Sequence, residues 1–138
     1  MSSGVIVNSA CLETYQELKL KKNHKFIILK LSKDYTQIIV DQTSESSDWE
    51  DFMKRLPEDE PRWAVYDLTY ERPEGGAGGK LILLSWSPDV AHAKAKMVFA
   101  SSRSALRRSL VGIDAEIQVN EYSEIAYEEV LGKVSSRF

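Results

Sequence analysis

The chain has 138 residues, of which 43% are hydrophobic and 28% are charged, and its formal net charge is −3. This length fits a single domain over residues 1–138 with a buried core. The negative net charge excludes a general attraction to nucleic acid, and no apolar run approaches the roughly 18 residues of a membrane span. A lone cysteine, Cys11, cannot form an intramolecular disulfide, and the N-terminus lacks signal-peptide features. We therefore expect a cytoplasmic protein, with access to the nucleus by size alone.

The first half of the chain predicts a helix, a hairpin and a second, shorter helix. Apolar side chains recur at helical spacing after Ser9, a candidate N-cap, as far as about Leu20. Strand patterns at residues 26–31 and 36–40 are separated by a connection of hairpin length. An amphipathic helix is expected over residues 48–56.

The second half predicts three more strands and two helices. Residues 63–70 are rich in aromatic and β-branched side chains, and residues 80–86 form a nearly continuous apolar run. The glycine-rich stretch 71–79 between them is expected to be a flexible hairpin loop. A short strand at 116–119 precedes a final helix over 123–134.

The longest helix is expected to start at Ser87-Pro88-Asp89. Serine is a good N-cap, proline suits the first helical position, and aspartate complements the positive end of the helix dipole. The helix should run to about Val111 and stop at Gly112. Interleaved helices and strands predict an α/β fold with a mixed sheet covered by helices on both faces.

The glycine-rich loop does not have the pattern of a phosphate-binding loop. That motif needs a glycine six residues before its lysine and a serine or threonine after it. Here Glu74 stands six residues before Lys80, and Leu81 follows it. We therefore expect no nucleotide cofactor at this loop.

No other enzyme motif stands out. His24 and His92 are the only histidines, and neither has metal-ligand spacing, so no metal site or cofactor is expected. Cys11 lies on an apolar helical stripe, which is typical of a buried structural cysteine. A small enzyme that uses Cys11 with a histidine stays as an alternative at this stage.

The longest helix has one unusual surface. On a helical wheel, Ala95, Phe99, Leu106 and Leu110 share the core side, and Met97 lies opposite them. Cationic residues surround Met97 on the outer side and flank: Lys94, Lys96, Arg103, Arg107 and Arg108. Because methionine is adaptable and recurs at partner-binding surfaces, this side is a candidate site for an acidic partner. A solvated basic face with an incidental methionine is the alternative.

The same helix resembles the long-helix signature of the actin-depolymerising factor (ADF)/cofilin family. The resemblance rests on Trp86-Ser87-Pro88-Asp89-Val90-Ala91, on residues 94–102 and on Ala105-Leu106-Arg107-Arg108. Residues 3–5, 17–19, 56–67 and 127–131 also resemble family segments, in the same order. The similarity therefore extends over nearly the whole chain.

This resemblance implies a central, mostly antiparallel sheet of five strands flanked by helices. It also implies a monomeric, non-catalytic protein of the actin cytoskeleton that binds actin monomers and filaments, prefers the ADP form, and promotes severing and depolymerisation. A relative of the same fold that binds filaments without strong severing is the alternative. Phosphoinositide headgroups are implied as competitors of actin for the same cations.

The resemblance also implies the residues of two actin-binding faces. The face for monomers and filaments comprises Ser3, Gly4, Val5, Lys94, Lys96, Met97, Arg103, Arg107 and Arg108. The filament-only face comprises Lys80, Lys133 and Arg137. Gly78 and Gly132 stand where some relatives carry charged residues, which predicts a modest filament affinity or severing activity. Ser3 resembles a regulatory phosphorylation site, where phosphate would add negative charge beside a cationic face.

Overall fold

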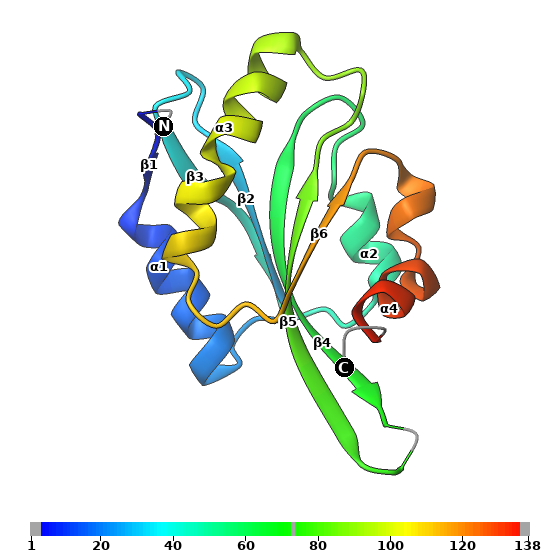
Figure 1. Cartoon of the computed structure of the whole chain (residues 1–138). Helices are drawn as coiled ribbons and strands as arrows, with labels where there is room; N and C mark the ends of the chain where they lie inside the picture. The colour runs from blue at the N-terminus through cyan, green and yellow to red at the C-terminus, as the bar shows by residue number, and fades with distance from the viewer. Residues whose placement is uncertain (1–3, 73, 136–138) are drawn as a thin grey trace.

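A six-stranded mixed sheet forms the centre of the fold (Figure 1). The computed structural model describes residues 4–72 and 74–135. The strand order is β1-β3-β2-β4-β5-β6, and the bounds are Ile6–Val7 (β1), Phe26–Leu31 (β2), Gln37–Ser44 (β3), Arg62–Glu71 (β4), Ala77–Trp86 (β5) and Ala115–Val119 (β6). The three central pairs are antiparallel, and the two edge pairs are parallel. The predicted mixed sheet is confirmed, with one strand more than expected because β1 pairs with β3.

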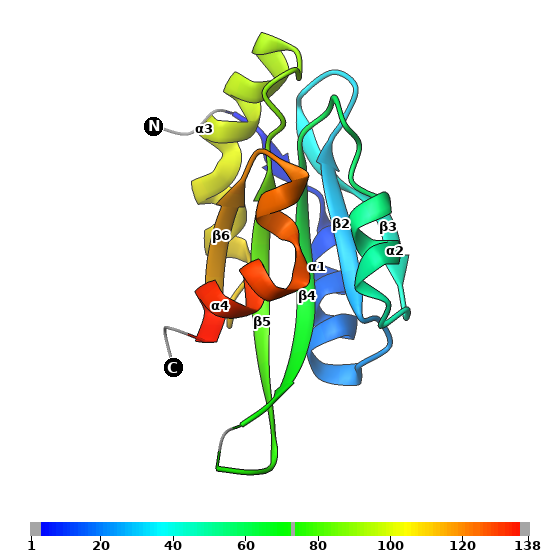
Figure 2. The ribbon, with the colours of Figure 1, turned by 90° about the vertical axis from the view of Figure 1, so that its right-hand side faces the viewer.

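Helices cover both faces of this sheet (Figures 1 and 2). One face carries α1 (Ser9–Gln16), its π-helical continuation η1 (Glu17–Lys21) and α3 (Ala93–Ser109). The other face carries α2 (Trp49–Lys54), the 3-10 turn η2 (Tyr122–Ile125) and α4 (Tyr127–Ser135). Among the described residues, no helix is both long and apolar enough to cross a membrane.

The first helix begins one residue earlier than predicted. Its N-cap is Asn8 instead of Ser9, because the Asn8 side chain accepts a hydrogen bond from the Ala10 backbone N–H at 2.9 Å. The amide of Asn8 also donates to Gln37 on β3 at 2.8 Å. Asn8 therefore fixes both the start of α1 and its position beside the sheet.

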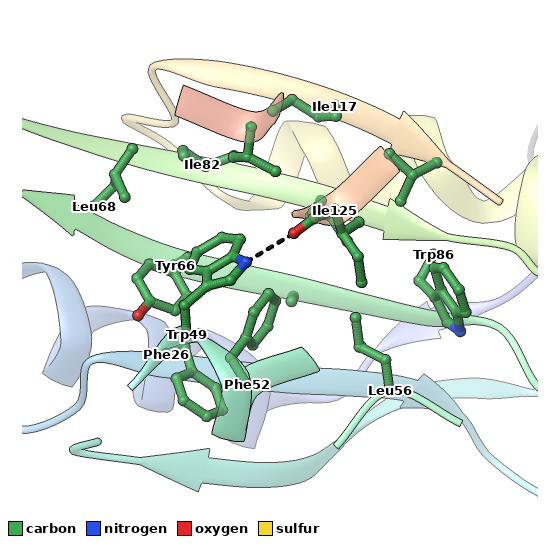
Figure 3. Close-up of a cluster of buried hydrophobic side chains, with 14 of the residues drawn as sticks. Phe26, Trp49, Phe52, Leu56, Tyr66, Leu68, Ile82, Trp86, Ile117 and Ile125 are labelled. Carbon is green, nitrogen blue, oxygen red and sulfur yellow. Dashed lines mark hydrogen bonds between the residues drawn. The ribbon is translucent and has the colours of Figure 1, made fainter. Parts of the chain in front are cut away.

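Aromatic side chains fill the core under α2 and α4 (Figure 3). Phe26 and Tyr66 stack with their ring centroids 5.6 Å apart, and Trp49 packs against Tyr66 at 4.7 Å. The Trp49 indole N–H donates to the Ile125 carbonyl at 2.7 Å (Figure 3). This bond ties α2 to η2, so both helical segments are held on the same face.

Strands β4 and β5 form a long hairpin that projects beyond the rest of the molecule (Figure 1). The pairing continues to Glu71 and Ala77, so the prediction that residues 71–79 form a loop is wrong for residue 71 and for residues 77–79. Gly75 and Gly76 adopt φ angles of +98° and +87° at the tip. Positive φ is accessible to glycine without steric cost, which explains both glycines at this turn.

The longest helix begins later than the sequence predicts. Ser87 does not cap it, because its backbone N–H donates to the Val119 carbonyl and continues the pairing of β5 with β6. A turn closed by the bond from the Ala91 N–H to the Pro88 carbonyl follows. The observed N-cap is His92, whose ring nitrogen accepts from the Lys94 N–H at 3.2 Å.

The end of α3 is fixed by the N-terminal helical segment. Tyr15 and Lys19 both donate to the Val111 carbonyl, at 2.7 and 2.8 Å. The helix ends at Ser109, short of the predicted stop at Gly112, which takes a φ of +98° in the connection to β6. These bonds hold α3 across the sheet beside α1.

The last predicted helix is divided into two segments. Glu121 and Glu124 form a capping box on η2, and Ala126 returns to an extended conformation before α4 begins. The predicted start at Ser123 is therefore wrong. The α4 helix packs on the sheet through Val130 and Val134, which are fully or almost fully buried.

Candidate functional site

The outer surface of α3 is the candidate site, and its inner side is held by the core. Ala95, Phe99 and Leu106 are buried, and Phe99 stacks on Trp63 of β4 with a centroid distance of 3.9 Å. The buried Ser102 hydroxyl donates to the Val98 carbonyl at 2.6 Å, so its polarity is satisfied within the helix. The predicted core side of this helix is confirmed.

Met97 lies on the outward side, as the helical wheel predicts. Its side chain is 64% exposed, and Lys94 and Arg108 on the same side are also exposed. The Lys94 ammonium lies 5.7 Å from the centroid of the Tyr35 ring. An exposed methionine between cations therefore forms the centre of this surface.

The cations on one side of α3 already have partners within the protein, which the sequence does not show. Arg103 and Arg107 both pair with Glu116 on β6, Arg103 through a hydrogen bond from Nε and Arg107 at 3.6 Å. Lys96 donates to the Asp89 carbonyl oxygen at 3.1 Å. We define the outward α3 surface as Lys94, Met97 and Arg108, and the flank as Lys96, Arg103 and Arg107.

Glu116 is the residue that sequence reasoning missed. Its side chain is only 16% exposed, although it lies on a short edge strand. The alternation of Glu116 and Gln118 with buried residues was visible in the sequence. That pattern predicts one polar face of the strand, but it does not identify the helix whose side chains contact that face.

The N-terminal segment lies next to α3. Strand β1 contacts α3, Val5 is buried at 7% exposure, and Ile6 is 66% exposed. Gly4 is exposed with a φ of +82°. The structure therefore brings Gly4 and Val5 to the side of the sheet that carries Met97, whereas Ser3 lies outside the described residues.

The predicted filament residues belong to the opposite layer. Lys80 precedes Leu81 on β5, and Leu81 packs on the side of α1 and α3. Because side chains alternate along a strand, Lys80 faces the other side, where Ile82 packs with the residues under α4. Lys133 is exposed on α4, and Arg137 lies outside the described residues. The two predicted faces are therefore on opposite sides of the sheet.

Cys11 is confirmed as a buried cysteine. Its thiol donates to the Ile38 carbonyl at 3.3 Å, and burial raises the pKa of the thiol to about 11. A thiol with this pKa is almost entirely protonated at neutral pH and is a poor nucleophile. No cluster of three or more metal-ligating side chains is found in residues 4–72 and 74–135.

A sheet of this topology with one outward cationic helix defines an α/β binding domain of the ADF-homology class. The family described as "Cofilin/tropomyosin-type actin-binding protein" matches residues 4–135. The chain therefore belongs to the ADF/cofilin family.

Three relatives illustrate this membership. A cofilin of Mycosarcoma maydis is 51% identical over 98% of this chain and 97% of its own length. The crystal structure of a Streptomyces griseoflavus cofilin superposes with a TM-score of 0.91 at 53% identity, and it covers 96% of this chain and 98% of that one. Plasmodium berghei actin depolymerization factor 2 superposes with a TM-score of 0.88 at 26% identity, over 99% of both chains.

Proposed function

We propose that the protein binds actin monomers and filaments through the outward α3 surface and through residues 3–5, of which Gly4 and Val5 lie on the side of the sheet that carries α3. The exposed Met97 between cations carries this proposal, because an apolar centre ringed by positive charge suits an acidic protein surface with an apolar cleft. Lys96, Arg103 and Arg107 on the flank would add charge at the edge of the contact. Membership in a family of actin-binding proteins identifies actin as the partner.

The finer activity that we propose is a preference for ADP-actin with severing and depolymerisation of filaments. The alternative is filament binding without strong severing, and Gly78 favours a modest activity. A Cβ atom at Gly78 would stand 2.6 Å from the Tyr70 ring, so a basic side chain could enter there only if that ring moved. Lys80, Lys133 and Arg137 would then supply the filament-only contacts.

The protein would act by binding, without catalysis of its own. The cations of α3 would also attract phosphoinositide headgroups, which would compete with actin. Phosphorylation of Ser3 would add about two negative charges to a segment proposed to bind an acidic partner, and it would therefore weaken actin binding. The cytoplasmic actin cytoskeleton, with entry into the nucleus, is the proposed location.

Co-sedimentation with filaments tests the proposal. The variant carrying Lys94→Ala and Lys96→Ala should lose filament and monomer binding while its stability changes little, because exposed charges contribute little to folding. A variant with Lys21→Ala and Lys54→Ala, two exposed lysines elsewhere, removes the same charge and should bind normally. Wild-type protein that stays in the supernatant while the filaments sediment would refute filament binding.

Two further measurements address the finer activity. Imaging of single labelled filaments distinguishes severing from simple binding, because only severing creates new ends. Lys80→Ala or Lys133→Ala should weaken filament binding more than monomer binding. Equal losses for both forms of actin would argue against a separate filament face.

A further inference from the structure

A polar pocket lies beside the outward α3 surface. It has a volume of about 550 Å³ and lies between α3, the end of β5 and the edge strand β6. Phe99 and Ala100 of α3 contribute apolar atoms to its lining, whereas Lys96 and Arg103 contribute cations. The pocket therefore adjoins the surface proposed to bind actin but is formed largely by other residues.

A buried hydroxyl in this pocket has no partner. Ser85 lines the pocket, is only 5% exposed, and its Oγ atom makes no hydrogen bond with any described residue. A buried polar group without a partner costs stability, on the order of 1–3 kcal/mol. Such a group needs an explanation, and a ligand that enters the pocket would supply one.

The lining is rich in hydrogen-bond donors. Lys96 makes no ion pair with any described residue, and its ammonium contacts only the neutral backbone oxygen of Asp89. The Asp89 carboxylate, the one acidic group of the lining, already accepts from the Asn120 amide at 3.3 Å. Free donor capacity remains on Lys96 and on the hydroxyls of Ser85 and Ser87. This combination favours an anionic acceptor.

We propose that this pocket receives an acidic side chain of the partner that docks on α3. The carboxylate of an aspartate or glutamate would accept from the Lys96 ammonium and, once the buried Ser85 hydroxyl turns towards the pocket, from that hydroxyl as well; both would be charge-assisted contacts of the stronger kind. The inference rests on the proposed function, since actin is taken as the partner. It adds Ser85 and Ala100 to the contact surface, neither of which belongs to the outward α3 surface.

Two substitutions at Ala100, to glutamine and to glutamate, test the charge of the partner side chain in the pocket, because these two residues differ in charge but hardly in size. Ala100 is exposed on α3 and lines the pocket, and glutamine and glutamate are both good helix formers, so the fold should be kept. Ala100→Gln should weaken actin-monomer binding by partly filling the pocket. Ala100→Glu should weaken it by about a further tenfold or more, because two carboxylates would then be juxtaposed.

The matched control is the same pair of substitutions at Ala93. This residue is exposed on the same helix, two turns away and outside the pocket lining. The difference between Ala93→Glu and Ala93→Gln measures the general effect of one negative charge on α3, expected to be about two- to threefold at physiological salt. A larger effect of charge at Ala100 than at Ala93 supports the proposal.

Ser85→Ala provides a second, independent measurement. Removal of the unpartnered hydroxyl should leave the protein as stable as the wild type or more stable, and should weaken actin binding by about three- to tenfold. A purely structural serine would not lower affinity while stability is kept.

The outcomes separate this inference from the proposed function. If wild-type protein fails to bind actin, the proposed function is wrong and this inference falls with it. If the wild type binds and the Ser85 and Ala100 variants bind equally well, only the pocket proposal is overturned. Tighter binding by Ala100→Glu than by Ala100→Gln would also overturn it, because the occupant would then be basic.

Discussion

Glu116→Gln tests how the flank of α3 is held against the sheet. The Glu116 carboxylate forms ion pairs with Arg103 and Arg107, whose side chains are 43% and 41% exposed. Pairs with this exposure contribute about 0.2–1 kcal/mol each, so loss of both should lower the free energy of unfolding by about 0.4–2 kcal/mol. A chain of 138 residues has an unfolding entropy of about 0.3 kcal/mol/K, and the Tm should therefore fall by roughly 1.5–7 °C.

Urea unfolding and calorimetry give the two quantities directly. A double-mutant cycle between Glu116→Gln and Arg103→Gln should show a coupling energy larger than the cycle with Arg107→Gln, since Arg103 makes the closer contact. Added salt should reduce both couplings because the arginines are partly solvated. A Tm within 1 °C of the wild type, or coupling energies indistinguishable from zero, would refute the ion-pair argument.

Three other substitutions test separate features. Gly132→Ala should raise stability by about 0.5–1 kcal/mol, because a Cβ atom there meets nothing within 4 Å; a loss in urea unfolding would contradict this. Gly78→Ala should change the stability of the hairpin by less than about 1 kcal/mol, because the added Cβ atom meets only the ends of the Tyr70 and Arg72 side chains, which can turn away; hydrogen exchange of the hairpin amides tenfold faster than in the wild type would contradict this. Burial raises the pKa of the Cys11 thiol from 9.0 to about 11. The contribution of the buried neutral thiol to the free energy of unfolding is therefore complete below pH 9 and is lost as the pH rises towards 11. Between pH 9 and 10, wild-type protein under reducing conditions should therefore lose about 1 kcal/mol more stability than Cys11→Ala; parallel pH profiles would contradict the buried thiol.

The order of helices and strands and the outward side of α3 were predictable because both depend on local periodicity. Met97 lies opposite Phe99 on any regular helix, whatever the rest of the chain does. The start of α3 was not predictable in the same way. Ser87 satisfies every local rule for an N-cap, but its backbone is already paired with Val119, which is 32 positions further along the chain.

The contacts of the site depended on packing and were hidden from the sequence. Glu116 and Arg103 meet because β6 pairs in parallel with β5, at the edge of the sheet beside α3. Ser85 sits in an apolar run typical of a covered strand, so its position in a pocket could not be inferred. Strand β1 was missed because two residues are too few to show an alternating pattern.

The three tryptophans divide between the two layers that the sheet separates. Trp63 stacks on Phe99 beneath α3, whereas Trp49 and Trp86 lie in the aromatic core on the opposite side. All three are at most 9% exposed, so each should emit at short wavelength in the folded protein and shift to the red on unfolding. Variants that keep Trp63 alone, or one of the other two, would therefore report each layer by fluorescence and reveal whether both melt at the same denaturant concentration.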